Sequence, residues 1–274
     1  MALLGRAGAD CVRRWGRDRG DLDLLIYAGT YRTRFVTEPA IAALLTGALD
    51  VNAHPASLNG KRTLAFDVFN GGVAVLNACH VAAEMIRARK AASAMVVAAE
   101  TENNAAAFPT ELLGIEETGS ALLLEAADGR EGFRAFRFRS FPEHGDAFVS
   151  HLTNRNGKTY LRFTQDPDLE RYYVRAIVEA VDEFLRGESL DVSHVTKIFP
   201  PQISSAFIAS LSCAMHVPGD RFVDAVGGGR DLFTSSLPYA LRHARDHGLI
   251  EEGHVGLFIG VGSGIQVGCA LYDF

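Results

Sequence analysis

The chain has 274 residues, a length that suits one large domain or two of medium size. Apolar residues make up 48% and charged residues 22%, enough for a hydrophobic core, and the net charge of −6 argues against a general nucleic-acid-binding protein. No apolar run is long enough to span a membrane, and the N-terminus lacks the apolar region and cleavage site of a secretion signal.

In chain order, the first feature is the amphipathic helical pattern of MALLGRAGADCVRRWGRDRG, which we expect its glycines to break. Four later segments are almost continuously apolar, as in strands covered on both faces of a sheet: 22–28, 94–99, 121–124 and 255–261. Segments of helical period lie between them: 73–89, 172–186, 204–214 and 237–246. This alternation predicts an α/β fold.

The two halves of the sequence repeat one order of segments. In the first half, a helix precedes DLDLLIYAGT, and AFDVFNGG, ASAMVVAAET and TGSALLLEA follow. In the second, YVRAIVEAVDEFL precedes DVSHVTKIFPPQ, and RFVDAVGGG, GHVGLFIGVGSG and IQVGCALYDF follow. We therefore expect a doubled βα unit, with halves 1–132 and 133–274 and a junction near 128–133.

These motifs, in this order, resemble the thiolase superfamily, most closely the type III ketosynthases (β-ketoacyl-ACP synthase III-like enzymes). DLDLLIYAGT, AFDVFNGGVAVLNACHVAAEMI, IFPPQISSAFI, DLFTSSLPYAL and GVGSGIQVGCAL each match a segment of the family, and together they span nearly the whole chain. The resemblance implies a thiolase-like fold, in which two pseudo-repeated βα halves form α-β-α-β-α layers.

The resemblance places the family's catalytic cysteine, histidine and asparagine at Gly72, Pro201 and Asp231. Glycine offers no sulfur for an acyl thioester, and proline has no polar side-chain group to donate a hydrogen bond. Aspartate would present an anion where the developing enolate oxygen needs a neutral donor. The alignment therefore predicts a degenerate triad and no catalytic residue.

Three further expectations come from the same resemblance. Phe35 falls where relatives carry a phenylalanine that crosses the dimer interface and helps close the partner's acyl tunnel. The chain starts inside what would be the helix after the family's first strand, so that strand and the residues that grip coenzyme A are expected to be absent. Five residues are expected to form the turns around the pocket: Asn70, Gly71, Gly262, Ser263 and Gly264.

Other motifs favour structural roles. The four cysteines are far apart, and Cys213-x-x-His216 has no matching pair, so we expect reduced thiols, no metal and no cofactor in a cytoplasmic protein. GVGSG at 260–264 predicts a turn between strands rather than a dinucleotide loop. Cys79 is read as a packed core thiol rather than a displaced nucleophile, and the neighbouring His80 as a helix–helix contact.

The resulting hypothesis is a catalytically inactive ketosynthase III-like subunit that forms a heterodimer or heterotetramer with an active homologue. The complex would act in a fatty-acid-like, polyketide or other secondary-metabolite pathway and reach acyl carrier protein or acyl-CoA through the partner. The strand at 94–99 is expected to extend the sheet across the interface. Two alternatives remain: an enzyme that uses Asp231 for decarboxylation, cyclisation or acyl transfer, and a homodimeric protein that sequesters an acyl group.

Overall fold

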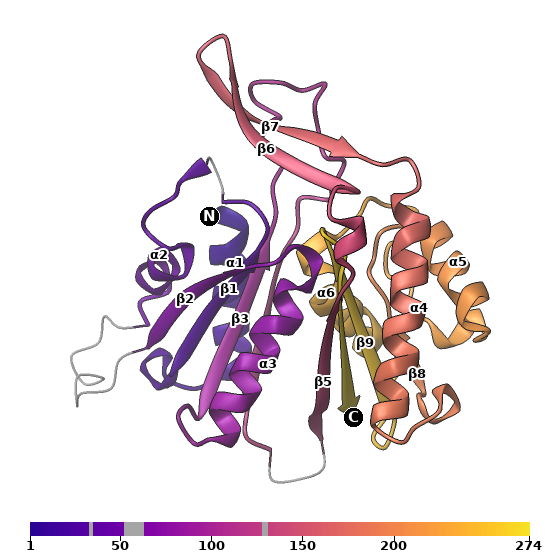
Figure 1. The fold of residues 1–274 in the computed structure, drawn as a ribbon. Coiled ribbons are helices and arrows are strands. Elements are labelled where there is room, and N and C mark those ends of the chain that lie inside the picture. Colours follow the sequence, from indigo (N-terminus) through magenta and orange to yellow (C-terminus); the bar gives the residue numbers. More distant parts are fainter. Residues whose placement is uncertain (33–34, 52–62, 128–130) are drawn as a thin grey trace.

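The computed structural model describes residues 1–32, 35–51, 63–127 and 131–274 (Figure 1). The first half contains α1 (Ala2–Trp15), β1 (Leu24–Gly29), α2 (Ile41–Ala48), β2 (Leu64–Phe69), α3 (Ala74–Arg87), β3 (Ser93–Ala99) and β4 (Gly119–Glu125). The second contains β5 (Gly132–Ser140), β6 (Phe148–Arg155), β7 (Lys158–Gln165), α4 (Leu169–Gly187), β8 (Lys197–Phe199), α5 (Ser205–Met215), α6 (Ser236–Asp246), β9 (Val255–Gly262) and β10 (Gln266–Asp273).

The two sheets have related topologies. The first has the strand order β2-β1-β3-β4, and the second has the order β5-β10-β9-β8, with a further bridge from Ile198 of β8 to Phe222. In each, a parallel pair (β1–β3 or β8–β9) is followed by an antiparallel neighbour (β4 or β10). The repeat expected from the sequence is therefore present in the two four-stranded sheets, and within them β5 is the strand whose counterpart is missing from the described residues.

The predicted division of the chain stays a prediction. Residue 132, the proposed end of the first half, is the first residue of β5. Residues 128–130, where the junction was expected to begin, lie outside the described residues.

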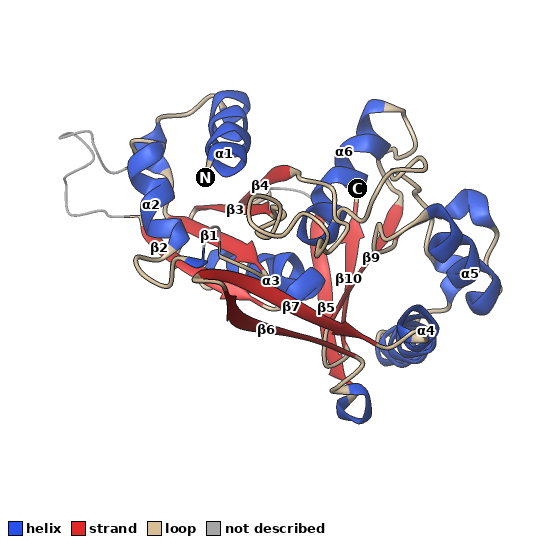
Figure 2. Ribbon diagram, turned by 90° about the horizontal axis from the view of Figure 1, so that it is seen from above, coloured by secondary structure: helices blue, strands red, loops and turns tan. Residues whose placement is uncertain are grey.

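Five layers follow from the alternation of side chains along the strands. Leu25 and Tyr27 pack in a cluster with α1 and α2, whereas Leu24 and Ile26 pack in the central cluster with α3 and α6. The second sheet contributes Phe258 and other residues to that central cluster, and its opposite face packs against α4 and α5. The expected α-β-α-β-α arrangement is confirmed (Figure 2).

The expectation that glycines break the N-terminal helix is wrong. Helix α1 runs through Gly5 and Gly8 and ends at Gly16, whose φ of 72° is left-handed and whose N–H donates to the Val12 carbonyl. A Cβ at Gly8 would lie 2.9 Å from Leu49 Cδ1. Gly8 is therefore a close contact between α1 and the end of α2 rather than a point of breakage.

The strand at 94–99 was expected at the partner interface, and this expectation is also wrong. That segment is part of β3, which pairs with β1 on one side and with β4 on the other. Among the described strands, the free edges of the first sheet belong to β2 and β4. A continuous sheet across an interface can form only through one of these two strands.

Candidate functional site

A cavity of about 210 Å³ lies where the turn after β2 meets the end of β9, the start of α4 and the loops before α5 and α6. Gly72, Pro201 and Asp231 all line it. Gly72 comes well over a hundred residues before Pro201 and Asp231 in the sequence, yet the fold brings all three to one site. Their equivalence to a catalytic triad stays a prediction.

Gly72 has no room for a side chain. It follows Gly71, which has a left-handed φ of 54°, in the short 3₁₀ turn Gly71–Val73 that leads into α3. A Cβ at position 72 would lie 2.5 Å from the carbonyl oxygen of Val261, and a Cβ at Gly260 would lie 2.9 Å from the Gly72 carbonyl oxygen. The backbones of the turn and of β9 approach so closely that only glycine fits on both sides.

Pro201 is held in place by its buried neighbour Gln202. The Gln202 Nε2 donates to the carbonyls of Pro200 and Val223 at 2.9 and 3.0 Å, and its Oε1 accepts the Ala225 N–H at 2.8 Å. This side chain therefore joins the loop after β8 to the segment 223–225. It satisfies backbone groups that would otherwise be buried without partners, so Gln202 has a structural role here.

Asp231 places a carboxylate in the cavity. Its Oδ1 accepts the Phe233 N–H at 2.7 Å, and its backbone forms a bridge to Ile115. The pKa of Asp231 is raised to about 7, mainly by burial in the cavity; the hydrogen bond from the Phe233 N–H opposes this shift, and the nearby Glu170 carboxylate adds to it. Near neutral pH this group is therefore divided between its acid and its anion.

The sequence did not point to Glu170 and Tyr173, which line the same cavity from the start of α4. Burial raises the Tyr173 pKa, so its phenol stays protonated. The described residues that line the cavity include no cysteine, histidine, lysine or arginine. Besides the residues already named, its polar side chains are those of Ser236, Ser263 and Gln165. A helical period alone could not reveal which turn of α4 faces a site.

The predicted turn residues divide into two groups. Gly262 and Ser263 line the cavity, whereas Asn70, Gly71 and Gly264 lie in the adjoining turns and are not among its lining residues. The Asn70 Nδ2 donates to Asn77 Oδ1 at 2.7 Å and to Gln266 Oε1 at 2.9 Å, which ties the turn to β10.

Phe35 lies in the loop between β1 and α2. It is half-buried, has a left-handed φ of 58°, and is not among the residues that line this chain's cavity. A role of Phe35 in this chain's own cavity is therefore not supported, and a role toward a partner stays a prediction.

Cys79 and His80 of α3 both pack against neighbouring parts of the fold. Cys79 is fully buried, and burial raises its pKa to about 12, so it remains a neutral thiol. The His80 ring packs 4.9 Å from the ring of Phe136 on β5. All four cysteines are unpaired. Within the described ranges no group of three potential metal ligands occurs, and no helix there is long and apolar enough to cross a membrane.

Known proteins resemble both the sequence and the fold. The family model for the C-terminal part of 3-oxoacyl-[acyl-carrier-protein] synthase III matches residues 185–274. The β-ketoacyl-[acyl-carrier-protein] synthase III of Thioalkalivibrio sulfidiphilus is 25% identical over 286 residues, covering 99% of this chain and 83% of its own length. That of Clostridium perfringens is 21% identical over 287 residues, covering 98% and 83%.

Solved structures share the fold over the whole chain. The synthase III of Aquifex aeolicus superposes with a TM-score of 0.81 at 19% identity, covering 99% of this chain and 83% of the other. A variant of Xanthomonas campestris OleA crystallised with lauric acid and lauroyl-CoA gives 0.83 at 18% identity, covering 99% and 82%. The chain is therefore similar in sequence to these synthase III proteins and has their thiolase-like fold.

Proposed function

We propose that the chain is a catalytically silent ketosynthase III-like subunit that pairs with an active ketosynthase homologue in an acyl-transfer or condensation complex. The observation that carries this proposal is the contact between Gly72 and Val261. The position that would hold the nucleophile has lost its side chain, and the backbone of β9 occupies the space that a side chain would need.

The rest of the cavity supports the same conclusion. A condensing enzyme needs a nucleophile to hold the acyl group and donors for the oxyanion that develops during reaction. Pro201 donates nothing, and Asp231 and Glu170 add negative charge where an oxyanion would form. The volume of about 210 Å³ is also smaller than that of most small-molecule sites.

The free edge of β2 is the surface that we assign to the partner. Leu64 and Phe69, at the two ends of this strand, are 51% and 40% exposed, and Leu44 of the neighbouring α2 is 40% exposed. An unprotected edge with exposed apolar side chains favours pairing with another chain. Phe35 lies in the loop that leads to α2, so the proposed contact with the partner's acyl tunnel would come from this side.

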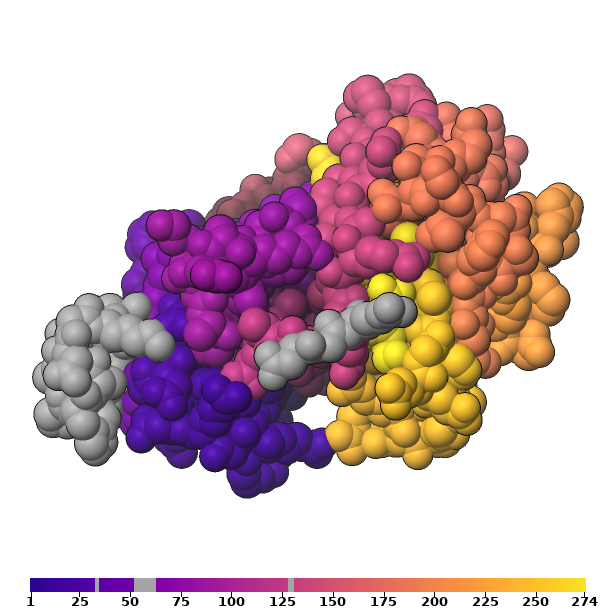
Figure 3. All heavy atoms as spheres, turned by 90° about the horizontal axis from the view of Figure 1, so that it is seen from below, coloured from indigo at the N-terminus to yellow at the C-terminus, as the bar shows by residue number. Residues whose placement is uncertain are grey.

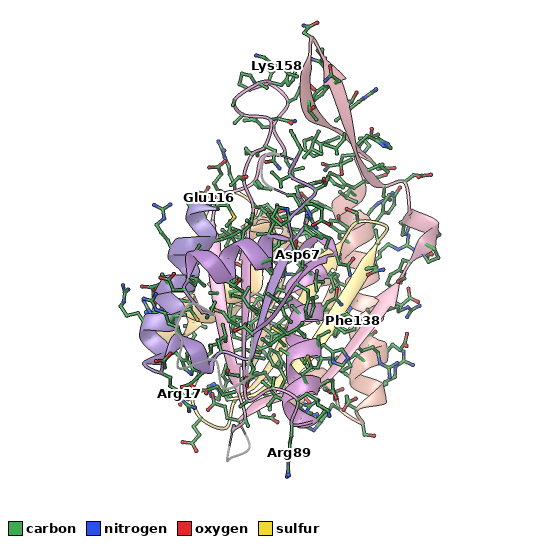
Figure 4. All side chains as sticks on the ribbon, turned by 90° about the vertical axis from the view of Figure 1, so that its left-hand side faces the viewer. Arg17, Asp67, Arg89, Glu116, Phe138 and Lys158 are labelled. Carbon is green, nitrogen blue, oxygen red and sulfur yellow. The ribbon has the colours of Figure 1, made fainter. Side chains whose placement is uncertain are left out.

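Contacts around Asp67 tie Arg32 and the start of α2 to β2. Asp67 Oδ2 and Oδ1 accept the N–H groups of Ile41 and Ala42 at 2.9 and 2.8 Å, and Arg32 Nη2 lies 3.3 Å from Asp67 Oδ2. The Arg32 guanidinium also lies 5.0 Å from the centre of the Phe69 ring. Figure 4, in which Asp67 is labelled, looks onto this side of the molecule. Arg32 and the start of α2 are therefore tied to β2 before a partner binds, which lowers the ordering cost of binding.

Co-expression with a ketosynthase III homologue from the same organism tests the proposal. Native mass spectrometry should detect a hetero-oligomer, and Phe69→Glu should abolish it because a charge would be buried at the interface. Tyr239→Glu is the matched control, since Tyr239 is an aromatic residue of α6, outside the proposed surface, and is 44% exposed. A chain that stays monomeric beside every such homologue would contradict the proposal.

A second candidate function is an enzyme with altered chemistry in which Asp231 is the general base. The observation that favours it is the Asp231 pKa of about 7, which is suited to proton transfer at neutral pH. Asp231→Asn would then abolish turnover. Under the silent-subunit proposal, the same variant leaves the activity of the complex nearly intact.

A further inference from the structure

The cavity that Gly72, Pro201 and Asp231 share has apolar walls and a polar mouth. Its buried apolar residues on α3, α6 and β9 are Leu76, Leu237, Ile259 and Val261. Phe148 and Gln165, which pair across the base of the β6–β7 hairpin, also line it. This hairpin projects from one end of the molecule (Figure 1).

The mouth of the cavity lies at the hairpin end. Among the described lining residues, the exposed ones are Gln165 at the end of β7, Glu170 on the first turn of α4 and Ser263 after β9. Figure 3 shows the opposite end of the molecule, where the purple segment that contains α3 lies against the second half of the chain. A ligand would therefore enter beside these three polar side chains and reach the apolar walls behind them.

The carboxylates of this cavity have no cationic partner in the described part of the lining. Asp231 Oδ1 accepts the Phe233 N–H at 2.7 Å, and Asp231 Oδ2 has no hydrogen-bond partner among the residues that the structure describes. Glu170 adds a second carboxylate, and its neighbour Arg171 is paired with Asp168 at 2.8 Å. A buried carboxylate without a counter-ion is costly, and a ligand that supplies a cation removes that cost.

Neutral oxygen atoms complete the polar part of the cavity. Tyr173 on α4 and Ser236 at the start of α6 both line it. The Ser236 Oγ accepts the buried Gln202 N–H at 3.2 Å and keeps a second lone pair. Together with the Asp231 carboxylate, these groups offer acceptors to an ammonium ion, which has three N–H donors and no acceptor. A carboxylate or phosphate ligand would meet two like charges instead.

The volume of the cavity limits the ligand to a small molecule. An apolar cavity of about 150 Å³ holds one molecule of benzene. The volume here is about 210 Å³. One such ring with a short aminomethyl arm therefore fits, with the ring against the apolar walls and the amine at the carboxylates.

We propose that this cavity binds a small primary ammonium ion whose apolar body is about the size of one aromatic ring. Asp231 pairs with the cation, Glu170 adds attraction at the mouth, and the apolar walls hold the body of the ligand. The proposal does not depend on the pairing with a ketosynthase homologue, because binding is measured on this chain alone and pairing on the hetero-oligomer.

Asp231 makes this binding pH-dependent. Its pKa is about 7, so at lower pH the free chain must release the Asp231 proton before it pairs with an ammonium ion. Affinity should therefore rise about tenfold from pH 6 to pH 8 and then level off. Other titratable groups leave this trend unchanged. Burial raises the pKa of Tyr173, so its phenol stays neutral. Glu170, Arg230 and Glu116, whose N–H donates to the Asp231 carbonyl, are exposed.

Isothermal titration calorimetry of the unmodified chain with benzylamine tests the proposal. Benzyl alcohol is the neutral control of the same shape, and benzoate is the anionic one. At pH 8 benzylamine should bind with a Kd of about 1 mM or tighter, at least about tenfold tighter than benzyl alcohol, and benzoate should not bind. At pH 6 the benzylamine Kd should be about tenfold weaker, with proton release on binding, while the Kd of benzyl alcohol stays the same.

Charge-neutralising variants locate the binding site. Asp231→Asn should weaken benzylamine binding at least about tenfold at pH 8 and abolish its pH dependence. Glu170→Gln, at an exposed position, should weaken it less, and Asp182→Asn, on an exposed turn of the same helix outside the cavity, should leave the Kd unchanged. Absence of benzylamine binding at about 10 mM would overturn the proposal. So would equal affinity for benzyl alcohol or benzoate, or an unchanged Kd in Asp231→Asn.

Discussion

Replacement of Gly72 by alanine adds a Cβ at a position where the backbone of β9 leaves no room for one. The added Cβ would lie 2.5 Å from the Val261 carbonyl oxygen, whereas ordinary C···O contacts are about 3.3 Å or longer. Relief therefore requires the turn and β9 to separate by nearly 1 Å. The obstacle is backbone in the middle of the fold, so no flexible side chain can move aside.

The expected destabilisation follows from two opposing terms. Overpacking of this kind costs about 1–3 kcal/mol, and the loss of glycine's freedom in the unfolded chain returns about 0.4–1 kcal/mol. We expect Gly72→Ala to lower the free energy of unfolding by about 1–2 kcal/mol. For a protein of this size that corresponds to a fall in Tm of roughly 2–8 °C.

Urea unfolding of Gly72→Ala beside Gly5→Ala measures the effect. Gly5 lies within α1 with no heavy atom within 4 Å of an added Cβ, so the control should gain about 0.5–1 kcal/mol. Gly72→Cys should be destabilised like Gly72→Ala and should not regain acyl transfer. Wild-type stability of Gly72→Ala, or acylation of a fully stable Gly72→Cys, would refute the reasoning.

Three further predictions concern buried polar groups. Between about pH 4 and 7 the native state holds the Asp231 proton more tightly than the unfolded state, so the contribution of Asp231 to stability falls as pH rises through that range. Asp231→Asn should therefore be more stable than wild type by about 2–3 kcal/mol at pH 8 and equal to it at pH 4 in urea unfolding; a pH-independent difference would contradict this. Gln202→Leu should lower the free energy of unfolding by about 3 kcal/mol, because two carbonyls and one N–H lose their partner, and an unchanged midpoint would count against that role. Ser204→Ala should cost about 1 kcal/mol, since the Ser204 Oγ accepts the Phe207 N–H at the start of α5, whereas Ser205→Ala, which removes no cap, should cost less; equal costs would disprove the cap.

Much of the fold was accessible from the sequence because hydrophobic periodicity is a strong local signal. The apolar runs at 22–28, 94–99, 121–124 and 255–261 correspond to β1, β3, β4 and β9, and the four helical segments correspond to α3, α4, α5 and α6. The internal repeat also predicted correctly which strand of the first half corresponds to which strand of the second.

Other features depend on tertiary contacts that no local pattern contains. Gly8 looked like a helix breaker, but Leu49, about forty residues away, makes it a packing contact. The strand 94–99 looked suitable for an interface, but sheet order places it in the interior. The β6–β7 hairpin was not predicted, and Glu170 and Tyr173 reach the cavity only because of the position of α4. Conversely, the meeting of positions 72, 201 and 231 was expected from the resemblance to the type III ketosynthases.

The most direct test of the silent-subunit account is the intact mass of the purified chain after incubation with an acyl-CoA of medium length, alone and together with an active ketosynthase III. The account predicts an unchanged mass for this chain in both samples and an acyl adduct on the active partner. A stoichiometric, thioester- or ester-linked acyl group on this chain by itself would contradict it.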